Sequence, residues 1–538
     1  MEKCGITEKW QEGVLQVIPV EEGIIRVIRS PRPAPRPDEL VLQPQPDFDG
    51  WKRGSGRVLL ETDALRVSAG ETGLVFEDRE GRELLRELGA DFGPDLEEWM
   101  EQRFFSPEGE VLGGLGQQAD GAADYRGRFA HLCQFNTISA VPVLMSSRGY
   151  GILWNNCSLT ELNPHKTPLS LSWDVYSKTS HGSYTPEETG QYIFILEKRN
   201  KNTGFEELNL RVGEQTIIRQ GSNWHPNYFT GAVWLEADRS YEIWLDGDAN
   251  LYVQQPSQAS VTSFWSEMGS CIDYFFLYGP RMNDVIRRYR RLTGEVPLFP
   301  KWAYGYWQSK ECYRSGQELL DIVAEHRRRG HPMGAIVQDW MYWGDYGWNA
   351  MRFAPSYAAD MPEVIRQLHE NNVHLMVSVW PNFSEGSAPE DPAGSVWEDF
   401  SQKGYLMDDH VLPGMEDYTS ALQGFRRNYY DVWNPDARAA FWQWMDRGLF
   451  QAGVDAWWLD GTEPNLWSLQ GAYHHYRTCD GPAARRLNAY TLQHSRSIYQ
   501  NQRTASGEKR VFMLSRTGFT GIQSTGTAVW SGDTWGSW

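Results

Sequence analysis

The pattern of apolar and polar positions changes at about residue 297. Before that point short runs alternate between the two kinds of residue, as at Leu65 and Val67 and again at Leu74 and Phe76. A period of two, with Gly- and Asp-containing turns between the runs, is typical of antiparallel strands that bury one face. The N-terminal part of the chain is therefore expected to be built of β-strands.

Many short strands separated by turns favour a β-sandwich, because each strand can hide its apolar face against a second sheet. We expect the first part of this sandwich in residues 1–184 and its end, together with a linker helix, in residues 256–296. Residues 185–255 contain clear strand patterns around a polar, loop-rich middle. They predict a small β-sandwich module inserted into the N-terminal domain.

From residue 297 to residue 538 the pattern alternates between strand and helix, which is typical of a parallel sheet. An α/β barrel needs eight strands for closure. We therefore expect fold class α/β plus β, with a (β/α)8-type barrel represented by about six strands and its C-terminal part missing. The alternative is that another polypeptide closes the barrel. The predicted strands are 303–307, 334–338, 373–379, 454–459, 511–514 and 527–530.

Composition narrows the class of protein. The chain has 538 residues, 25 of them tryptophan, and a formal net charge of −19. An acidic balance disfavours nucleic acid and anionic membranes as partners, because both require a basic surface. No apolar run reaches the roughly 18 residues of a membrane span, and no secretory signal is visible, so we expect a cytoplasmic location.

The cysteines and histidines give no metal-binding pattern. Six cysteines are scattered without CxxC spacing, which favours free thiols in a reducing compartment. His474 and His475 lie near Cys479, but no further ligand stands at metal spacing. We expect neither a metal nor another cofactor, and the sequence leaves the oligomeric state open.

Carboxylates follow two of the predicted buried strands. Asp460 ends the run 454–459, and Asp533 follows the run 527–530. Parallel strands of an α/β barrel gather their carboxyl ends at one face, where such barrels place their chemistry. Two carboxylates among tryptophans are the minimum set for cleaving a glycosidic bond. The alternative for Asp460 is that it caps the turn after the strand.

These residues carry a resemblance to a known family. The motifs WWLDGTEP and WSGD, joined by FMLSRTGF, resemble glycoside hydrolase family 31, which contains α-glucosidases and α-xylosidases. The similarity extends over most of the chain. The three motifs lie at 457–464, 530–533 and 512–519, and further similar segments lie at 113–127, 297–313 and 335–345.

The resemblance implies a role for individual residues. The family position that matches Asp460 is the nucleophile, and the position that matches Asp533 is the acid/base. Arg516 is similar to the arginine that holds the nucleophile and the sugar, although a structural ion pair is its alternative role. Asp339 is similar to the aspartate that grips hydroxyls of the sugar, and Glu463 is expected to support the Asp460 loop.

Tryptophans near the strand ends are candidate platforms for the sugar ring, although each can equally pack in the core. The loop 113–127 resembles the segment that the family extends from the N-terminal sandwich over the barrel mouth. Residues 185–255 resemble a protective-antigen-type module found in some α-xylosidases of the family. The candidate tryptophans are Trp307, Trp343, Trp380 and Trp530, and the candidate loop residues are Gln117, Gln118 and Arg126.

The resemblance implies a retaining α-glycosidase that removes terminal non-reducing α-linked sugars from an oligosaccharide by double displacement. The inserted module and the long loop 381–430 favour an α-xylosidase that acts on xylosylated oligosaccharides. One alternative is an α-glucosidase or α-glucan transglucosidase. Another, from a different class, is a carbohydrate-binding fragment without turnover.

Overall fold

The computed structural model describes residues 5–10, 13–95, 98–199, 206–222, 226–384, 394–409, 427–464 and 472–534. The chain divides into two compact units. The first consists of Met1–Gly294, Ala484–Asn488 and Ser531–Trp538, and the second of Glu295–Ala483 and Ala489–Trp530. The second unit begins at Glu295, two residues before residue 297, the predicted start of the barrel.

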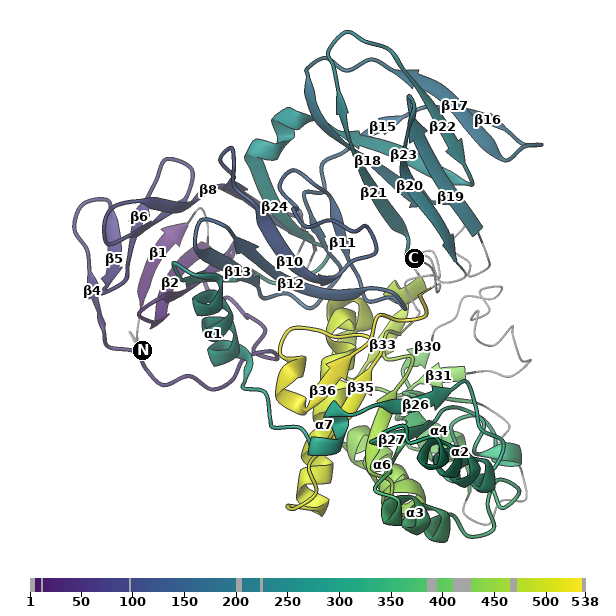
Figure 1. The fold of residues 1–538 in the computed structure, drawn as a ribbon. Helices are drawn as coiled ribbons and strands as arrows, with labels where there is room; N and C mark the ends of the chain where they lie inside the picture. The colour runs from purple at the N-terminus through teal and green to yellow at the C-terminus, as the bar shows by residue number, and fades with distance from the viewer. Residues whose placement is uncertain are drawn as a thin grey trace. The chain divides into compact units, whose positions relative to one another are not determined.

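The first unit contains a β-sandwich of antiparallel strands (Figure 1). Its seven-stranded sheet has the order β1 (Ile6–Trp10), β2 (Gly13–Glu21), β3 (Ile24–Ser30), β25 (Ile272–Tyr278), β13 (Tyr150–Trp154), β12 (Ser139–Ser146) and β10 (Leu112–Gln117). Its nine-stranded sheet has the order β11 (Ala130–Leu132), β14 (Thr160–Leu162), β24 (Val261–Ser266), β9 (Met100–Phe105), β8 (Glu83–Phe92), β7 (Leu74–Asp78), β6 (Leu65–Ala69), β5 (Val58–Thr62) and β4 (Trp51–Arg53).

The alternating apolar positions fill the space between these two sheets. Phe76 on β7 stacks on Phe276 on β25 with 4.4 Å between ring centroids, and both side chains are fully buried. Phe104 on β9 meets Tyr274 on β25 edge to face at 5.4 Å. Because β25 belongs to one sheet and β7 and β9 to the other, these contacts hold the two layers together.

The inserted module has two sheets and a core of its own, which includes the buried Phe194 and Leu245. Its first strand begins at Thr167, upstream of the expected start at residue 185. One sheet has the order β15 (Thr167–Leu169), β23 (Ala249–Gln254), β18 (Gly190–Lys198) and β21 (Tyr228–Leu235). The other has the order β16 (Ser172–Asp174), β17 (Thr179–Tyr184), β22 (Tyr241–Asp246), β19 (Glu206–Val212) and β20 (Gln215–Ser222).

The second unit is built on a parallel sheet whose strands follow one another in chain order. Parallel pairing places all the carboxyl ends at one edge, and short runs buried on both faces, such as Ala335–Gln338, suit such a sheet. The six strands are β26 (Trp307–Lys310), β27 (Ala335–Gln338), β28 (His374–Val379), β32 (Ala456–Leu459), β35 (Met513–Ser515) and β36 (Thr527–Val529).

The predicted first barrel strand, 303–307, is wrong in its position. Lys301–Tyr304 forms a 3-10 turn after Pro300, and the strand begins only at Trp307. The proline fixes its own φ and the turn ends at Gly305, so the apolar residues point under the sheet instead of entering it. Trp302 packs there against the ring of Phe512 at 5.6 Å.

Helices join the strands and gather beside them, with α2 packed on α3 and α6 on α7 (Figure 1). Four of them begin at a side chain that accepts first-turn N–H groups, namely Ser315, Asp360, Ser395 and Asn434. No helix among the described residues is long and apolar enough to cross a membrane. The helices are α1 (Met282–Thr293), α2 (Gly316–Arg328), α3 (Met361–Glu370), α4 (Val396–Gln402), α6 (Pro435–Met445) and α7 (Tyr490–Ala505).

The long connection 381–430 contains structure of its own. Strand β29 (Asn382–Ser384) pairs with β31 (Arg427–Tyr429), and α4 lies between them in the chain. The short strand β30 (Asp408–Asp409) pairs with β33 (Tyr476–Thr478), which pairs with β34 (Gly481–Pro482). The predicted role of this connection in shaping a site falls partly outside the described residues.

Candidate active site

The register of two neighbouring strands places Asp460 beside Arg516. Leu459 on β32 pairs with Ser515 on β35, so the residues that follow them leave the sheet side by side. Asp460 donates its backbone N–H to the carbonyl oxygen of Val379 at 3.1 Å, and Arg516 donates its own to that of Leu459 at 3.1 Å. The ends of β28, β32 and β35 are therefore fixed at one level.

Arg516 bridges two carboxylates at this level. Its Nη1 lies 2.8 Å from Asp460 Oδ1, and its Nη2 donates a hydrogen bond to Glu463 Oε1. All three residues are buried: Asp460 is 9% exposed, Arg516 is 6% exposed and Glu463 is 0% exposed. With little water to screen it, a guanidinium in this position offsets the negative charge of the two buried side chains and fixes their orientation. Glu463 thus lies on the same guanidinium as Asp460, and its predicted support of the Asp460 loop stays a prediction.

The loop between the two acids is closely fitted. Gly461 has a φ of 60°, and a Cβ there would lie 2.7 Å from Cε3 of Trp380. The Thr462 hydroxyl lies 3.0 Å from the hydroxyls of both Ser515 and Thr517. These contacts require a residue without a side chain at 461, and they tie the loop to the start of the next connection.

Trp380 forms a wall beside the acids. Its half-buried ring lies 5.7 Å from Cζ of Arg516 and 4.9 Å from the ring of Trp348. Asn349 holds its backbone from both sides, donating from Nδ2 to the carbonyl oxygen at 2.6 Å and accepting the N–H at Oδ1 at 3.2 Å. Sequence reasoning identified Trp380 but missed Asn349, whose partners are 31 residues away.

The other predicted tryptophans differ in their surroundings. Trp343 is 4% exposed and packs against Tyr342 at 4.9 Å and Trp348 at 5.3 Å. Trp307 meets the ring of Phe512 edge to face at 5.2 Å within the core under the sheet. Both rings pack against other aromatic rings in this structure, and their role as platforms for the sugar stays a prediction.

Asp339 and Trp530 follow strands β27 and β36 of the same sheet. Asp339 is half-buried, and its Oδ1 accepts the N–H of Trp340 at 2.8 Å. The half-buried ring of Trp530 lies 4.6 Å from that of Trp458, a residue that sequence reasoning left out. Trp458 lies within strand β32, and a tryptophan inside an apolar run is expected to pack in the core. Both Asp339 and Trp530 thus remain candidates for sugar contact.

Asp533 belongs to the first unit in this structure and is held there by Asn136. Asn136 Nδ2 donates to Asp533 Oδ2 at 2.7 Å, and Asn136 Oδ1 accepts the N–H of Asp533 at 2.7 Å. Gln117, from the predicted loop, donates to the carbonyl oxygen of Ser531 at 3.0 Å. Asp533 itself is exposed, which suits a group that must exchange protons with a substrate and water.

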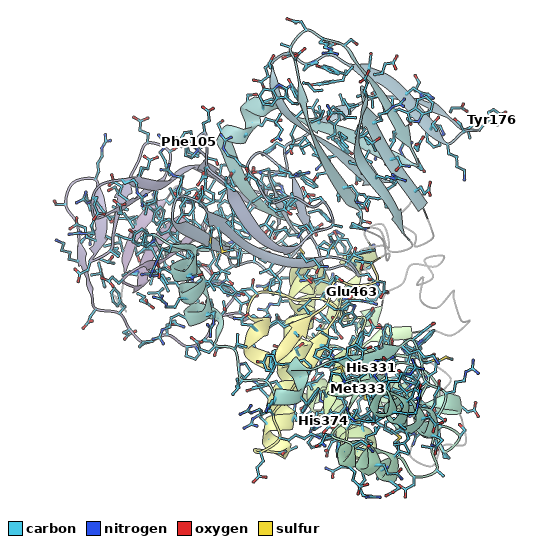
Figure 2. The ribbon with its side chains drawn as sticks, in the orientation of Figure 1. Phe105, Tyr176, His331, Met333, His374 and Glu463 are labelled. Carbon is cyan, nitrogen blue, oxygen red and sulfur yellow. The ribbon has the colours of Figure 1, made fainter. Side chains whose placement is uncertain are left out.

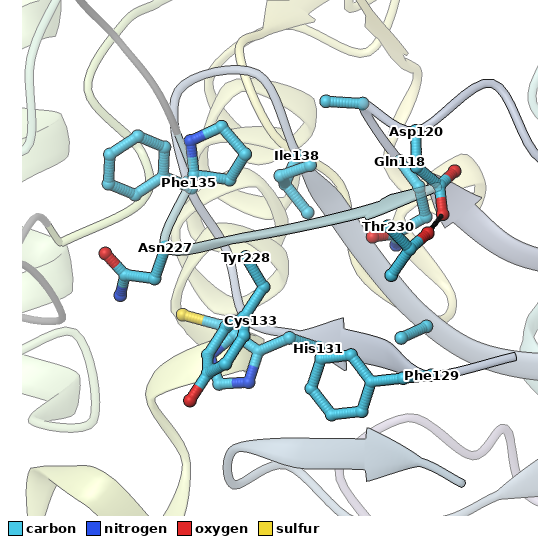
Figure 3. A pocket seen from close by; sticks show the side chains of 13 residues that line it. Gln118, Asp120, Phe129, His131, Cys133, Phe135, Ile138, Asn227, Tyr228 and Thr230 are labelled. Carbon is cyan, nitrogen blue, oxygen red and sulfur yellow. Dashed lines mark hydrogen bonds between the residues drawn. The ribbon is translucent and has the colours of Figure 1, made fainter. Parts of the chain in front are cut away.

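A pocket in the first unit is lined by residues of the sandwich and of the inserted module (Figure 3). Its polar side chains bond to one another or to their neighbours: Asp120 accepts from the Thr230 hydroxyl at 2.8 Å, and His131 Nδ1 lies 3.1 Å from Glu161. The bond between Thr230 and Asp120 joins β21 of the module to the sandwich, and the contact between His131 and Glu161 lies within the sandwich. Gln118, predicted at the barrel entrance, lines this pocket.

Residues with metal-ligand atoms close together lie elsewhere in the second unit. Among the described residues they are His369, His374 and Asp455, where His374 begins β28 and Asp455 precedes β32. Asp460 follows the opposite end of β32, so the two groups occupy opposite edges of the sheet.

Comparison with known proteins agrees with this architecture. Residues 296–538 match the model described as the glycosyl hydrolases family 31 TIM-barrel domain. The chain is 30% identical over 542 residues to an alpha-xylosidase of Saccharolobus solfataricus, covering 96% of this chain and 58% of that protein. It is 27% identical over 279 residues to alpha-glucosidase 2 of Bacillus thermoamyloliquefaciens, covering 51% of this chain and 34% of that protein.

A solved structure extends the likeness to the whole chain. The family 31 alpha-xylosidase from Xanthomonas citri matches with a TM-score of 0.86 at 28% identity, covering 98% of this chain and 65% of that one. The chain thus carries a glycoside hydrolase family 31 domain, and the predicted fold class is confirmed. It spans 58% of the length of the curated α-xylosidase that it matches.

Proposed function

We propose that this chain, with its family 31 barrel domain, supplies the catalytic residues of a retaining α-glycosidase. The observation that carries the proposal is the buried bridge from Arg516 to Asp460 and Glu463 at the carboxyl ends of adjacent strands. A carboxylate that is held ionised and oriented in this way suits a nucleophile. An acid in a merely capping role would need no second buried carboxylate on the same guanidinium.

The proposed reaction has two steps. In the first, an Asp460 oxygen attacks the anomeric carbon, the bond to the leaving oxygen breaks, and protonated Asp533 gives its proton to that oxygen. In the second, water attacks the glycosyl ester, Asp533 takes a proton from the water, and Asp460 leaves as a carboxylate. Two inversions give net retention at the anomeric carbon.

The remaining residues position these two. Arg516 offsets the charge of Asp460 before the attack and stabilises it again as the ester is hydrolysed. Glu463 holds the other arm of the guanidinium, so that Arg516 cannot turn away from Asp460. Asn136 fixes the backbone and the carboxylate of Asp533 through its amide. Asp339 is proposed to grip sugar hydroxyls, and Trp380 to bound the sugar.

Within this reaction we favour xylosylated oligosaccharides as substrates. The Saccharolobus and Xanthomonas relatives are named as alpha-xylosidases. The alternative, a glucosidase activity, is favoured by the named alpha-glucosidase among the relatives. A pocket that excludes the hydroxymethyl group of glucose discriminates by only about 10–200-fold, so weak α-glucosidase activity is expected beside the main one.

The test compares nitrophenyl α-xyloside with nitrophenyl α-glucoside for the wild-type protein and for Asp460→Ala. We expect a higher kcat/KM on the xyloside and no measurable turnover by the variant. The anomer first released, followed by NMR, should be α. Binding of xylosyl oligosaccharide without turnover by a folded wild-type protein would instead support the binding-fragment alternative.

A further inference from the structure

A second cluster of functional groups lies at the opposite edge of the barrel sheet from Asp460. Figure 2 shows His374 and Glu463 apart from each other in the second unit. His369 stands in the last turn of α3, His374 opens β28, and Asp455 directly precedes β32. Three elements that are separate in the chain thus bring two imidazoles and one carboxylate together.

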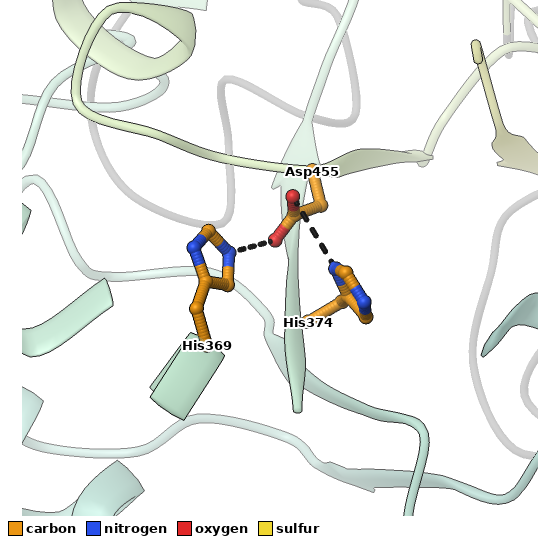
Figure 4. Close-up of side chains that lie close together, drawn as sticks. All are labelled: His369, His374 and Asp455. Atoms are coloured by element: carbon orange, nitrogen blue, oxygen red, sulfur yellow. Dashed lines mark hydrogen bonds and ion pairs between the residues drawn. The ribbon is translucent and has the colours of Figure 1, made fainter. Parts of the chain in front are cut away.

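The ligand atoms of these side chains converge on one point (Figure 4). His369 Nε2 lies 2.7 Å from Asp455 Oδ2, and His374 Nδ1 lies 3.4 Å from Asp455 Oδ1. All three ligand atoms fall within 4.8 Å of one another. His374 Nδ1 is buried and faces Asp455 Oδ1 across this longer contact, so both imidazoles turn a nitrogen toward the carboxylate.

The surroundings fix the carboxylate and leave the imidazoles adjustable. Asp455 is buried, and its Oδ2 also accepts the N–H of Leu375 at 2.9 Å. The ring of His374 stacks on Trp302 at 4.8 Å, whereas His369 lies at the surface with 39% of its side chain exposed. Burial raises the pKa of Asp455, but hydrogen bonds from the histidines and the charge of Lys509 outweigh this and hold it below its ordinary value.

We propose that His369, His374 and Asp455 form a binding site for a divalent transition metal of the zinc class. Two imidazole nitrogens and one carboxylate oxygen are a donor set that zinc accepts, with a water as the fourth ligand. Tetrahedral bonds of about 2.0–2.2 Å require the donors to stand somewhat over 3 Å apart. The two separations from Asp455, 2.7 and 3.4 Å, lie on either side of that value. Small side-chain rotations therefore suffice to bring the donors to the spacing that a metal requires.

The ammonium of Lys509 competes with a metal ion for the carboxylate of Asp455. Its Nζ lies 3.2 Å from Asp455 Oδ1 and donates to the carbonyl oxygen of Val454 at 2.6 Å. When no metal is bound, the ammonium supplies the positive charge that the buried carboxylate needs. A bound metal takes over that function, and the half-exposed lysine keeps its bond to Val454. The metal would join α3 to β28 and β32 and stabilise the folded barrel unit.

The experiment titrates Zn²⁺ into the metal-free protein, followed by calorimetry and by thermal unfolding, and repeats the titration with Co²⁺ while recording its visible absorption. We expect one site per chain, a Zn²⁺-dependent rise in Tm and the strong bands of tetrahedral Co²⁺. His369→Ala should weaken binding by more than the ~10–100-fold that loss of an outer partner costs. Lys509→Gln should strengthen it, because the competing charge is gone.

The chain offers a matched control in His326 and His331, whose rings lie 5.8 Å apart. Among the described residues these two histidines do not belong to a group of three close ligand atoms. His326→Ala should leave the affinity unchanged. Because His369 lies at the surface, His369→Ala is expected to fold, and its far-UV circular dichroism checks this. Absence of Zn²⁺ binding by the wild-type protein, or equal affinity in wild type and His369→Ala, would overturn the proposal.

Discussion

Arg516 Nη1 lies 2.8 Å from Asp460 Oδ1, and both residues are the first to leave neighbouring parallel strands. The pair is a consequence of register: Leu459 faces Ser515, and each strand ends at the next residue. Nothing else in the loops has to be arranged for the carboxylate and the guanidinium to meet. The remaining loop contacts orient the pair rather than create it.

Removing the guanidinium should therefore damage stability and activity together. Arg516→Met leaves Asp460 and Glu463 as two buried carboxylates without their common cation, and breaking a buried ion pair in this way costs about 3–5 kcal/mol. Urea unfolding measures that loss. Arg510→Met, at an exposed arginine that precedes β35, should change the free energy of unfolding by less than about 0.5 kcal/mol. Equal effects of the two substitutions would show that the bridge does not contribute.

The loop glycine gives a second prediction. Gly461→Ala would place a Cβ 2.7 Å from Trp380 at a φ of 60°, so the wall beside the acids has to move. We expect kcat/KM to fall at least tenfold. Gly404→Ala is the control, because Gly404 has a similar φ of 66° and open space around its Cβ position. If both variants lose the same activity, backbone strain and not the contact with Trp380 is the cause.

Asn136→Ala should impair protonation of the leaving group selectively. Without the amide, the Asp533 carboxylate and its backbone N–H lose the partners that hold them at 2.7 Å. A nitrophenolate leaves with little help from an acid, whereas a sugar alkoxide needs a proton. The expected loss is on the order of 100-fold for oligosaccharides and much smaller for nitrophenyl glycosides. Parallel loss on both substrates would argue against this role of Asn136.

His494 predicts how stability depends on pH. Burial of the ring, 0% exposed, lowers its pKa from 6.5 to about 3. The folded protein therefore keeps His494 neutral while the unfolded chain binds a proton below pH 6.5, so its contribution to stability is present above that pH and is lost as the pH falls toward 3. From pH 7.5 to pH 5.5 the loss from this residue is about 1.3 kcal/mol.

The measurement is urea unfolding of wild type and of His494→Gln at these two pH values. The variant is less stable at both, because it loses the bond between Tyr430 and Nδ1 at 2.8 Å. The informative quantity is the difference in free energy of unfolding between wild type and variant. This difference should be about 1.3 kcal/mol smaller at pH 5.5 than at pH 7.5. A deficit that does not change with pH would mean that His494 takes up its proton in the folded protein as well.

The parts that the sequence predicted are those encoded by local pattern. Asp460 and Asp533 follow apolar runs, and both runs form strands of the parallel sheet, β32 and β36. The strand 303–307 was misplaced because prolines and Gly305 around the run decide its backbone, and hydrophobicity does not report them. The sequence does not report the packing of Trp343 against Tyr342 and Trp348, because Trp348 belongs to the irregular segment after β27.

Contacts between distant segments had no local signal. Asn136 lies 397 residues from Asp533, and a lone asparagine after a short strand gives no sign of its partner. His369 and Asp455 are 86 residues apart and carry none of the close spacing that marks a metal motif in sequence. These residues are brought together by the order of the sheet and could be recognised only in the folded structure.

The identity of the nucleophile is the central claim, and covalent trapping tests it most directly. A 5-fluoro-α-xylosyl fluoride forms the glycosyl-enzyme quickly but slows its hydrolysis, so the intermediate accumulates. Peptide mapping by mass spectrometry should find one sugar per chain, attached to Asp460, and none on Asp460→Ala. Labelling of Glu463 or Asp533 in place of Asp460, or turnover of this reagent without a covalent adduct, would contradict the proposed mechanism.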